Sequence, residues 1–238
     1  MSADPTTVTY EVKRPTQGPA KFDWHLRQRY LVLGLALVGA GLFAASWFQP
    51  YWNFMLFAPQ YPDGLKLVIA LNGVTGDTAE INIINHYIGM GHLEDGAVLE
   101  KALGGYLIAA LAVVVTVVTL FIGKRLNWLA AVGAAGLPLG FIGDTMYWLY
   151  HFGHVLDPKA AIHIAPFTPT MFGTGKVGQF VTEAWPGVGF WMAIAGVAAV
   201  VVASVLRQRV CNDCPKREHC EALCSHGLVG VKPHAHAG

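Results

Sequence analysis

Long uncharged blocks of apolar residues constrain this chain more than any other feature of its sequence. Apolar residues make up 54% of its 238 residues, and charged residues make up only 13%. A helix needs about 20 apolar residues to cross a bilayer core of about 30 Å. Four blocks are long enough, so the sequence predicts an all-α membrane protein with a bundle of four transmembrane helices. The blocks are Tyr30–Trp47, Leu103–Gly123, Trp128–Tyr150 and Pro186–Leu206.

Basic residues beside these blocks predict the orientation, because Lys and Arg next to spans are held on the cytoplasmic side of the membrane. They gather before the first block, between the second and third, and after the fourth. Both termini are therefore expected in the cytoplasm, with two loops, 49–102 and 151–185, on the outer side. The first block follows the polar residues 1–29 and has no small-x-small cleavage site after it, so it is expected to stay as an anchor.

The predicted organisation has three parts. Residues 1–29 form a cytoplasmic arm, 30–206 the membrane domain, and 207–238 a cytoplasmic tail rich in cysteine and histidine. Topology already accounts for the basic residues, and the net charge is only +1, so nucleic acid is not an expected partner. The expected partners are the lipid bilayer and other membrane or periplasmic subunits.

The first outer loop has a β-rich pattern of its own. The runs Leu65–Leu71 and Ala79–Ile84 are separated by turn-forming residues at 72–77, which predicts a small outer hairpin. If Asn85 then caps a short helical turn, His86 and Met90 lie four residues apart on one face of it.

The outer side carries a group of candidate metal ligands. Asp144, His151 and His154 share one face of the third predicted span, and a carboxylate within a span is costly unless it has a partner. Imidazole and thioether groups together suit copper, whereas imidazole and carboxylate groups also suit zinc or iron. The alternative is that Asp144 bonds a neighbouring helix and the histidines are only solvated. The candidate set is His86, Met90, His92, Asp144, His151 and His154, with His163 in the second loop.

All four cysteines lie in the predicted cytoplasmic tail, where a reducing environment favours a metal site over disulfides. Two ligand sets fit the spacing. A zinc knuckle would use Cys211, Cys214, His219 and Cys224. A four-thiolate set for zinc or an iron–sulfur cluster would use Cys211, Cys214, Cys220 and Cys224.

Three segments carry a resemblance to a known group of proteins: Tyr61–Leu65, Asn85–Met90 and Gly173–Phe180. With them the chain resembles a family of small four-span bacterial membrane proteins encoded beside nitrous-oxide reductase and other copper-enzyme assembly genes. The resemblance implies a bacterial inner-membrane protein that acts in copper-enzyme maturation or respiratory electron flow. The cysteine-rich tail is not part of it.

These observations favour an accessory protein, not an enzyme, that binds copper at the outer face and supports a periplasmic respiratory copper enzyme. A redox subunit with a cytoplasmic iron–sulfur cluster is one alternative, and a structural subunit with a zinc-stapled tail is another. An enzyme in which a metal on Asp144, His151 and His154 activates water ranks last, because nothing identifies a substrate.

Overall fold

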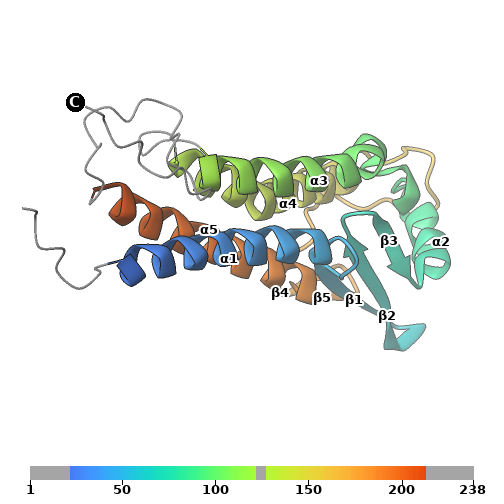
Figure 1. The fold of residues 1–238 in the computed structure, drawn as a ribbon. Helices are drawn as coiled ribbons and strands as arrows, with labels where there is room; N and C mark the ends of the chain where they lie inside the picture. Colours follow the sequence, from blue (N-terminus) through green and yellow to red (C-terminus); the bar gives the residue numbers. More distant parts are fainter. Residues whose placement is uncertain (1–21, 122–126, 213–238) are drawn as a thin grey trace, which may run out of the picture.

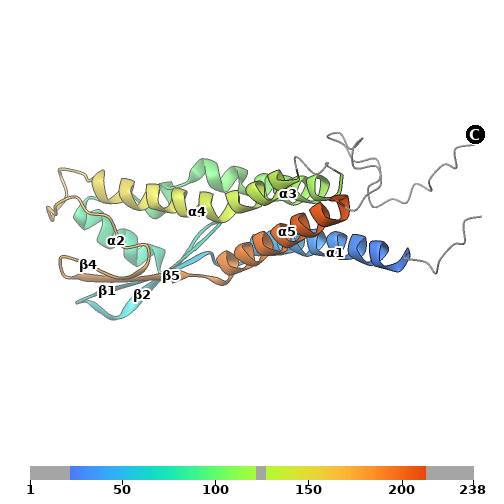
Figure 2. The same cartoon turned by 90° about the vertical axis from the view of Figure 1, so that its left-hand side faces the viewer.

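The computed structural model describes residues 22–121 and 127–212. Four long helices lie side by side at one end of the molecule, and a β-sheet forms the other, which we call the sheet end (Figures 1 and 2). Among the described residues, three helices are long and apolar enough to cross a membrane, and α1 contains a shorter apolar stretch, Tyr30–Ser46. The long helices are α1 (Phe22–Ser46), α3 (Val98–Phe121), α4 (Trp128–His154) and α5 (Val188–Asn212).

The four helices pack in a ring in which α1 and α4 each contact both α3 and α5. Gly39 of α1 and Gly196 of α5 lie where these two helices meet, and a Cβ at either position would press on the other helix. Small residues of this kind let two helix backbones approach closely in a membrane.

The sheet has five antiparallel strands in the order β3-β2-β1-β5-β4. The central strand β1 pairs with β2 on one side and with β5 on the other, so Trp52 lies opposite both Ile69 and Pro186. Both predicted loops therefore contribute to one sheet. The strands are β1 (Trp52–Ala58), β2 (Tyr61–Ala70), β3 (Gly73–Gly76), β4 (Gly173–Val177) and β5 (Phe180–Pro186).

The expected all-α bundle is therefore wrong, because residues 22–121 and 127–212 combine five α-helices with a five-stranded sheet. The central strand β1 could not be recognised from its sequence pattern. It reads Trp-Asn-Phe-Met-Leu-Phe-Ala and is apolar on both faces, so it lacks the alternation of polar and apolar residues that marks a half-exposed strand. The other half of the sheet comes from the second loop, where β5 pairs with β1 and the short, glycine-containing β4 pairs with β5.

The expected hairpin is only half correct. The run Leu65–Leu71 does lie largely in β2, but β2 turns back at once into β3, and Ala79–Ile84 is part of the helix α2 (Thr78–Ile88). Its buried side chains recur at helical spacing: Ile81, Ile84, Asn85 and Ile88. Asn85 is thus buried inside a helix, not at the start of one, and the helix ends at Gly89 in the left-handed conformation (φ 82°).

A compact junction joins the helices to the sheet. Backbone hydrogen bonds from Gly187 N to Tyr51 O and from Gly189 N to Pro50 O, each 2.8 Å, tie the start of α5 to the segment before β1. Tyr51 is fully buried, and its hydroxyl lies 2.7 Å from Ser46 Oγ. Because Ser46 donates its own hydrogen to Phe43 O, the Tyr51 hydroxyl is the donor of this pair.

We expect Tyr51→Phe to lower the free energy of unfolding by about 1 kcal/mol at neutral pH, because it removes one buried hydrogen bond. Burial raises the pKa of the Tyr51 phenol above its ordinary value of 10.0, because the charged phenolate would lose its hydration. The unfolded chain then ionises first, so wild-type stability is complete below about pH 10 and falls as the pH rises further. Thermal unfolding in detergent micelles should show that the variant loses less stability than the wild type between pH 8 and 11. An equal loss in both proteins would contradict this account.

Candidate functional site

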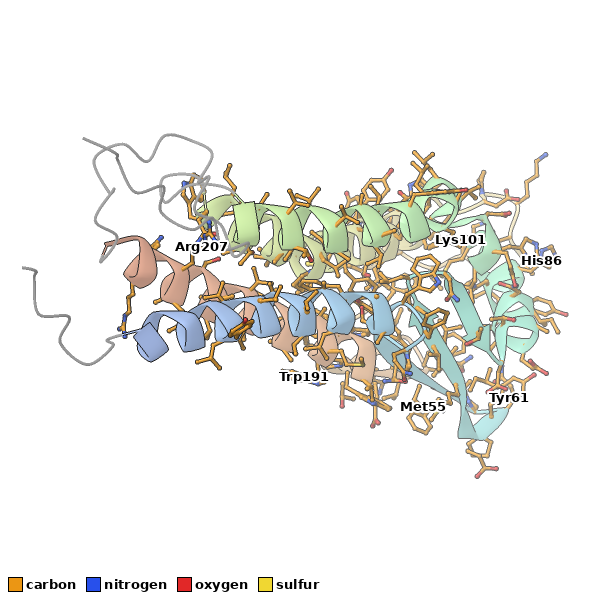
Figure 3. All side chains as sticks on the ribbon, viewed as in Figure 1. Met55, Tyr61, His86, Lys101, Trp191 and Arg207 are labelled. Atoms are coloured by element: carbon orange, nitrogen blue, oxygen red, sulfur yellow. The ribbon has the colours of Figure 1, made fainter. Side chains whose placement is uncertain are left out.

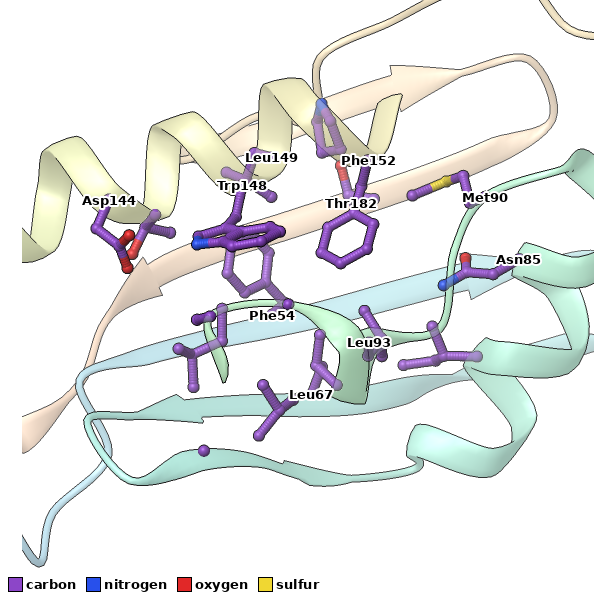
Figure 4. Close-up of a pocket in the computed structure, with 18 of the residues that line it drawn as sticks. Phe54, Leu67, Asn85, Met90, Leu93, Asp144, Trp148, Leu149, Phe152 and Thr182 are labelled. Atoms are coloured by element: carbon purple, nitrogen blue, oxygen red, sulfur yellow. The ribbon is translucent and has the colours of Figure 1, made fainter. Parts of the chain in front are cut away.

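A cavity of about 1070 Å³ lies between the sheet and the helices α3 and α4 (Figure 4). The sheet forms one wall because its register places apolar side chains of neighbouring strands on the same face. Phe54 lies opposite Leu67 on β2, and Leu56 lies opposite Thr182 on β5. With Ile69 on the next position of the same face, these residues line the cavity. The sheet therefore supplies a mainly apolar floor.

The opposite wall follows α4. Its lining residues run from Gly133 to Phe152, which at about 1.5 Å per residue is roughly 28 Å of helix. The larger ones recur every three to four residues: Phe141, Asp144, Thr145, Trp148, Leu149 and Phe152. The cavity is thus elongated and reaches from the sheet end into the apolar part of a helix that is long enough to cross a membrane.

Three glycines, Gly133, Gly136 and Gly140, line the deeper part of the cavity. A Cβ at any of them would meet no atom within 4 Å outside the helix's own neighbouring backbone, so they are not places where another helix packs closely. Gly104 of α3 differs, because a Cβ there would lie 2.9 Å from the Trp47 ring. The glycines of α4 therefore widen the cavity, and they do not tighten a helix contact.

The chain segments that follow α2 and α4 meet at the sheet end of the cavity. Asp157 N donates to Gly89 O at 2.8 Å, and Ile162 N donates to Tyr87 O at 2.9 Å. Phe167 N donates to Gly153 O at 3.0 Å, which fixes the later part of the same segment to α4. Residues 155–169 thus close this end.

A small clamp holds the turn after α2 and the short helix η1 (Leu93–Asp95). Asn82 accepts a hydrogen bond from Leu93 N at 3.0 Å and donates one to Glu94 Oε2 at 2.7 Å. The backbone N–H of Glu94 and the Asn82 amide hold the pKa of the Glu94 carboxyl below its ordinary value. Leu93 is thereby fixed on the cavity wall.

Few polar groups line the cavity, and two of them, on α4, lie close to each other. Asp144 and Trp148 lie one turn apart on α4, and Figure 4 shows the carboxylate and the indole nitrogen on the same side of the helix. Glu100 of α3 faces the same region. The Trp148 Nε1 atom is buried and has no hydrogen-bond partner of ordinary length among the described residues. Lys101 donates to Glu94 O at 2.8 Å.

Of the six predicted outer metal ligands, Met90 and Asp144 line this cavity, from different walls (Figure 4). His86 and His92 are exposed, and Figure 3 shows His86 at the far tip of the sheet end. In the part of the chain that the structure describes, no three His, Cys, Asp or Glu side chains lie close enough to hold one metal ion. The structure thus brings two of the six to one cavity and leaves the others apart.

The histidines of α4 have other contacts. His151 stacks on Tyr147 with ring centroids 6.0 Å apart, and Trp148 lies edge-on at 5.5 Å. His154 stacks on Tyr150 with ring centroids 3.8 Å apart, and His154 Nδ1 lies 2.9 Å from the backbone carbonyl oxygen of Tyr150. In the second loop, His163 Nε2 lies 3.0 Å from Pro158 O.

The predicted tail site lies almost wholly outside the described residues. Cys211 falls in the last turn of α5, whose side chains there are not described. The other candidates, Cys214, His219, Cys220 and Cys224, lie beyond residue 212. The zinc and iron–sulfur hypotheses for this segment stay predictions.

The sequence reasoning missed the cavity itself. The glycines at 133, 136 and 140 could have signalled it, but the same pattern is typical of close helix packing, and only the missing neighbour distinguishes the two cases. The sequence also permits an aromatic belt of Tyr147, Trp148 and Tyr150 at the membrane surface, and of these three Trp148 lines the cavity.

Comparison with known proteins gives no relative to reason from. No protein-family model matches the chain, and no curated protein matches it significantly. The resemblance to proteins of copper-enzyme assembly therefore stays a prediction.

Proposed function

We propose that this protein is a membrane-anchored binding protein that holds an apolar or amphiphilic molecule in the cavity between the sheet and α3 and α4. The cavity of about 1070 Å³ with mainly apolar walls is the observation that carries this proposal. Its volume lies just above the usual range of small-molecule sites, about 300–1,000 Å³, and such sites are mostly apolar with a few placed polar groups. The basic residues of the sequence support a sheet end that faces outward.

A membrane-borne molecule is favoured because the cavity follows α4 into its apolar span. The glycines at 133, 136 and 140 leave space beside the helix where larger side chains would fill it. A chain of a lipid-like molecule could lie along this stretch while the rest of the molecule occupies the part beside the sheet. Such a protein would serve as an accessory protein at the outer face of the membrane, as the sequence hypothesis requires.

Copper binding at the sheet end is a second proposal, and Met90 supports it. Its thioether, a soft ligand that suits copper, lies on the cavity wall in Figure 4, across from the elements that carry Asp144. Support for a periplasmic respiratory copper enzyme would follow from this proposal. Native mass spectrometry of the purified protein would distinguish the two proposals, because a bound copper ion and a bound organic molecule differ in mass.

Filling the cavity tests the first proposal. We expect Gly140→Leu to weaken binding of an apolar fluorescent probe by at least about tenfold, because displacing even one ligand group from an apolar pocket is worth about 1–3 kcal/mol. The measurement is a titration of the full-length protein in detergent micelles, with probe emission as the signal.

Gly143→Leu is the matched control for this experiment. A Cβ at Gly143 also meets no atom within 4 Å, and the residue lies on the same helix, but it does not line the cavity. The control should bind the probe as the wild type does. Equal binding by the wild type and both variants, or no saturable binding in any of them, would contradict the proposal.

A further inference from the structure

We propose that the molecule in the cavity is an uncharged amphiphile with a hydroxyl-bearing aromatic head, of the quinol class, and one long apolar chain. This inference rests on the proposed function and specifies its ligand. The head would lie against Asp144, Glu100 and Trp148, and the chain would follow the glycine stretch of α4.

The charges of the lining exclude an anionic head. Two carboxylates, Asp144 and Glu100, face the same part of the cavity. Among the described lining residues the one cation is Lys101, whose ammonium group donates to the backbone carbonyl of Glu94. A phosphate or a fatty-acid carboxylate would therefore meet the like charges of the half-buried Asp144 and the exposed Glu100, which repel it.

The indole N–H distinguishes a hydroxyl from an amine. Trp148 Nε1 is a buried donor that faces the Asp144 carboxylate one turn earlier but has no partner at ordinary hydrogen-bond length among the described residues. A ligand amine in its charged form only donates, so it would satisfy Asp144 but not the indole. A hydroxyl group donates to the carboxylate and accepts from the indole, so it satisfies both.

The aromatic lining favours a ring in the head. Phe54 on the sheet and Phe152 on α4 border the same space as the Trp148 ring in Figure 4. Aromatic rings gain from offset or edge-on contacts with one another beyond the area that they bury. The long course of the cavity along α4 then suits a chain attached to that ring.

The test is a binding series with full-length protein in detergent micelles under anaerobic conditions. The probes are a quinol with a short isoprenoid chain, a primary amine of matched chain length and a fatty acid of matched chain length. The variants are Asp144→Asn, which removes the carboxylate, and Trp148→Phe, which keeps a ring but removes the N–H. Asp95→Asn is the control, because Asp95 is exposed and does not line the cavity.

We expect the quinol to bind most tightly and the fatty acid least. Asp144→Asn should weaken quinol binding about tenfold and Trp148→Phe about threefold to tenfold, the usual effect of a lost hydrogen bond to a charged or a neutral group. Asp95→Asn should match the wild type with every probe.

Tightest binding by the amine would overturn the hydroxyl assignment in favour of a cationic amphiphile. Equal binding of all three probes, or quinol binding unaffected by both variants, would overturn the head-group assignment altogether. In each of these cases the apolar probe would still bind and Gly140→Leu would still block it, so the proposed function would stand. Loss of the proposed function would instead show as no saturable binding of the apolar probe.

Discussion

Replacing Trp52 with alanine is expected to lower the free energy of unfolding by about 3–5 kcal/mol, as removal of a fully buried large aromatic ring does. The ring is fully buried. It packs edge-on against Phe190 at 5.4 Å and Phe172 at 4.8 Å, and its Nε1 donates to Met171 O at 2.8 Å. The variant would leave both a void where the helices meet the sheet and a buried carbonyl without its donor.

Chemical unfolding in detergent micelles, followed by circular dichroism, measures this effect. Trp185→Ala is the matched control, because Trp185 lies on the neighbouring strand β5, points to the other sheet face and is partly exposed. The control should lower the free energy of unfolding far less than Trp52→Ala does. Equal small losses in the two variants would show that the junction around Trp52 is not a centre of stability.

The second large effect is expected for Gly153→Ala. A Cβ at Gly153 would overlap the carbonyl oxygen of Phe167, so the segment 155–169 would have to move away from α4. It would also lose the 3.0 Å hydrogen bond from Phe167 N to Gly153 O. Overpacking of this kind costs about 1–3 kcal/mol and occasionally more, and the obstacle here is backbone, which yields less easily than a side chain.

Gly143→Ala provides the comparison on the same helix. No atom lies within 4 Å of a Cβ at Gly143, so the variant should be neutral or stabilising by up to about 1 kcal/mol, the gain of alanine over glycine in a helix. Limited proteolysis of residues 155–169 should be faster in Gly153→Ala alone. Equal cleavage rates in both variants would contradict the closing role of this segment.

The helices could be predicted from the sequence because their signal is local. The predicted spans from Leu103, Trp128 and Pro186 correspond to α3, α4 and α5, and these are the three helices found long and apolar enough to cross a membrane. In a bilayer core every backbone group must be bonded within its own segment, so an uninterrupted apolar block predicts a helix with few competing outcomes.

The sheet could not be predicted in the same way because its pairing is not local. β1 bonds β5 across more than a hundred intervening residues, as the pair Trp52 and Pro186 shows. Nothing in either loop alone indicates that partner. In Ala79–Ile84 the β-branched isoleucines suggested a strand, but the spacing of Ile81, Ile84 and Ile88 with one buried face prevailed and gave a helix.

Only part of the candidate site could be predicted from the sequence, because one of its features is local and the others depend on the packing of distant segments. Asp144 was recognised because a carboxylate within a span needs an explanation, and it does line the cavity. His151 and His154 were expected to share a helix face with Asp144, but neither lines the cavity. Each imidazole ring instead stacks on an aromatic neighbour on α4. A cavity depends on where side chains are missing, and that is set by the packing of distant segments.

Native mass spectrometry of the intact protein released from detergent micelles tests the central claim most directly. We predict one bound organic molecule of defined mass in the wild type and in Gly143→Leu, and its loss from Gly140→Leu. The bare polypeptide mass in all three proteins, or an adduct retained equally by Gly140→Leu, would contradict the claim that this cavity is a binding site.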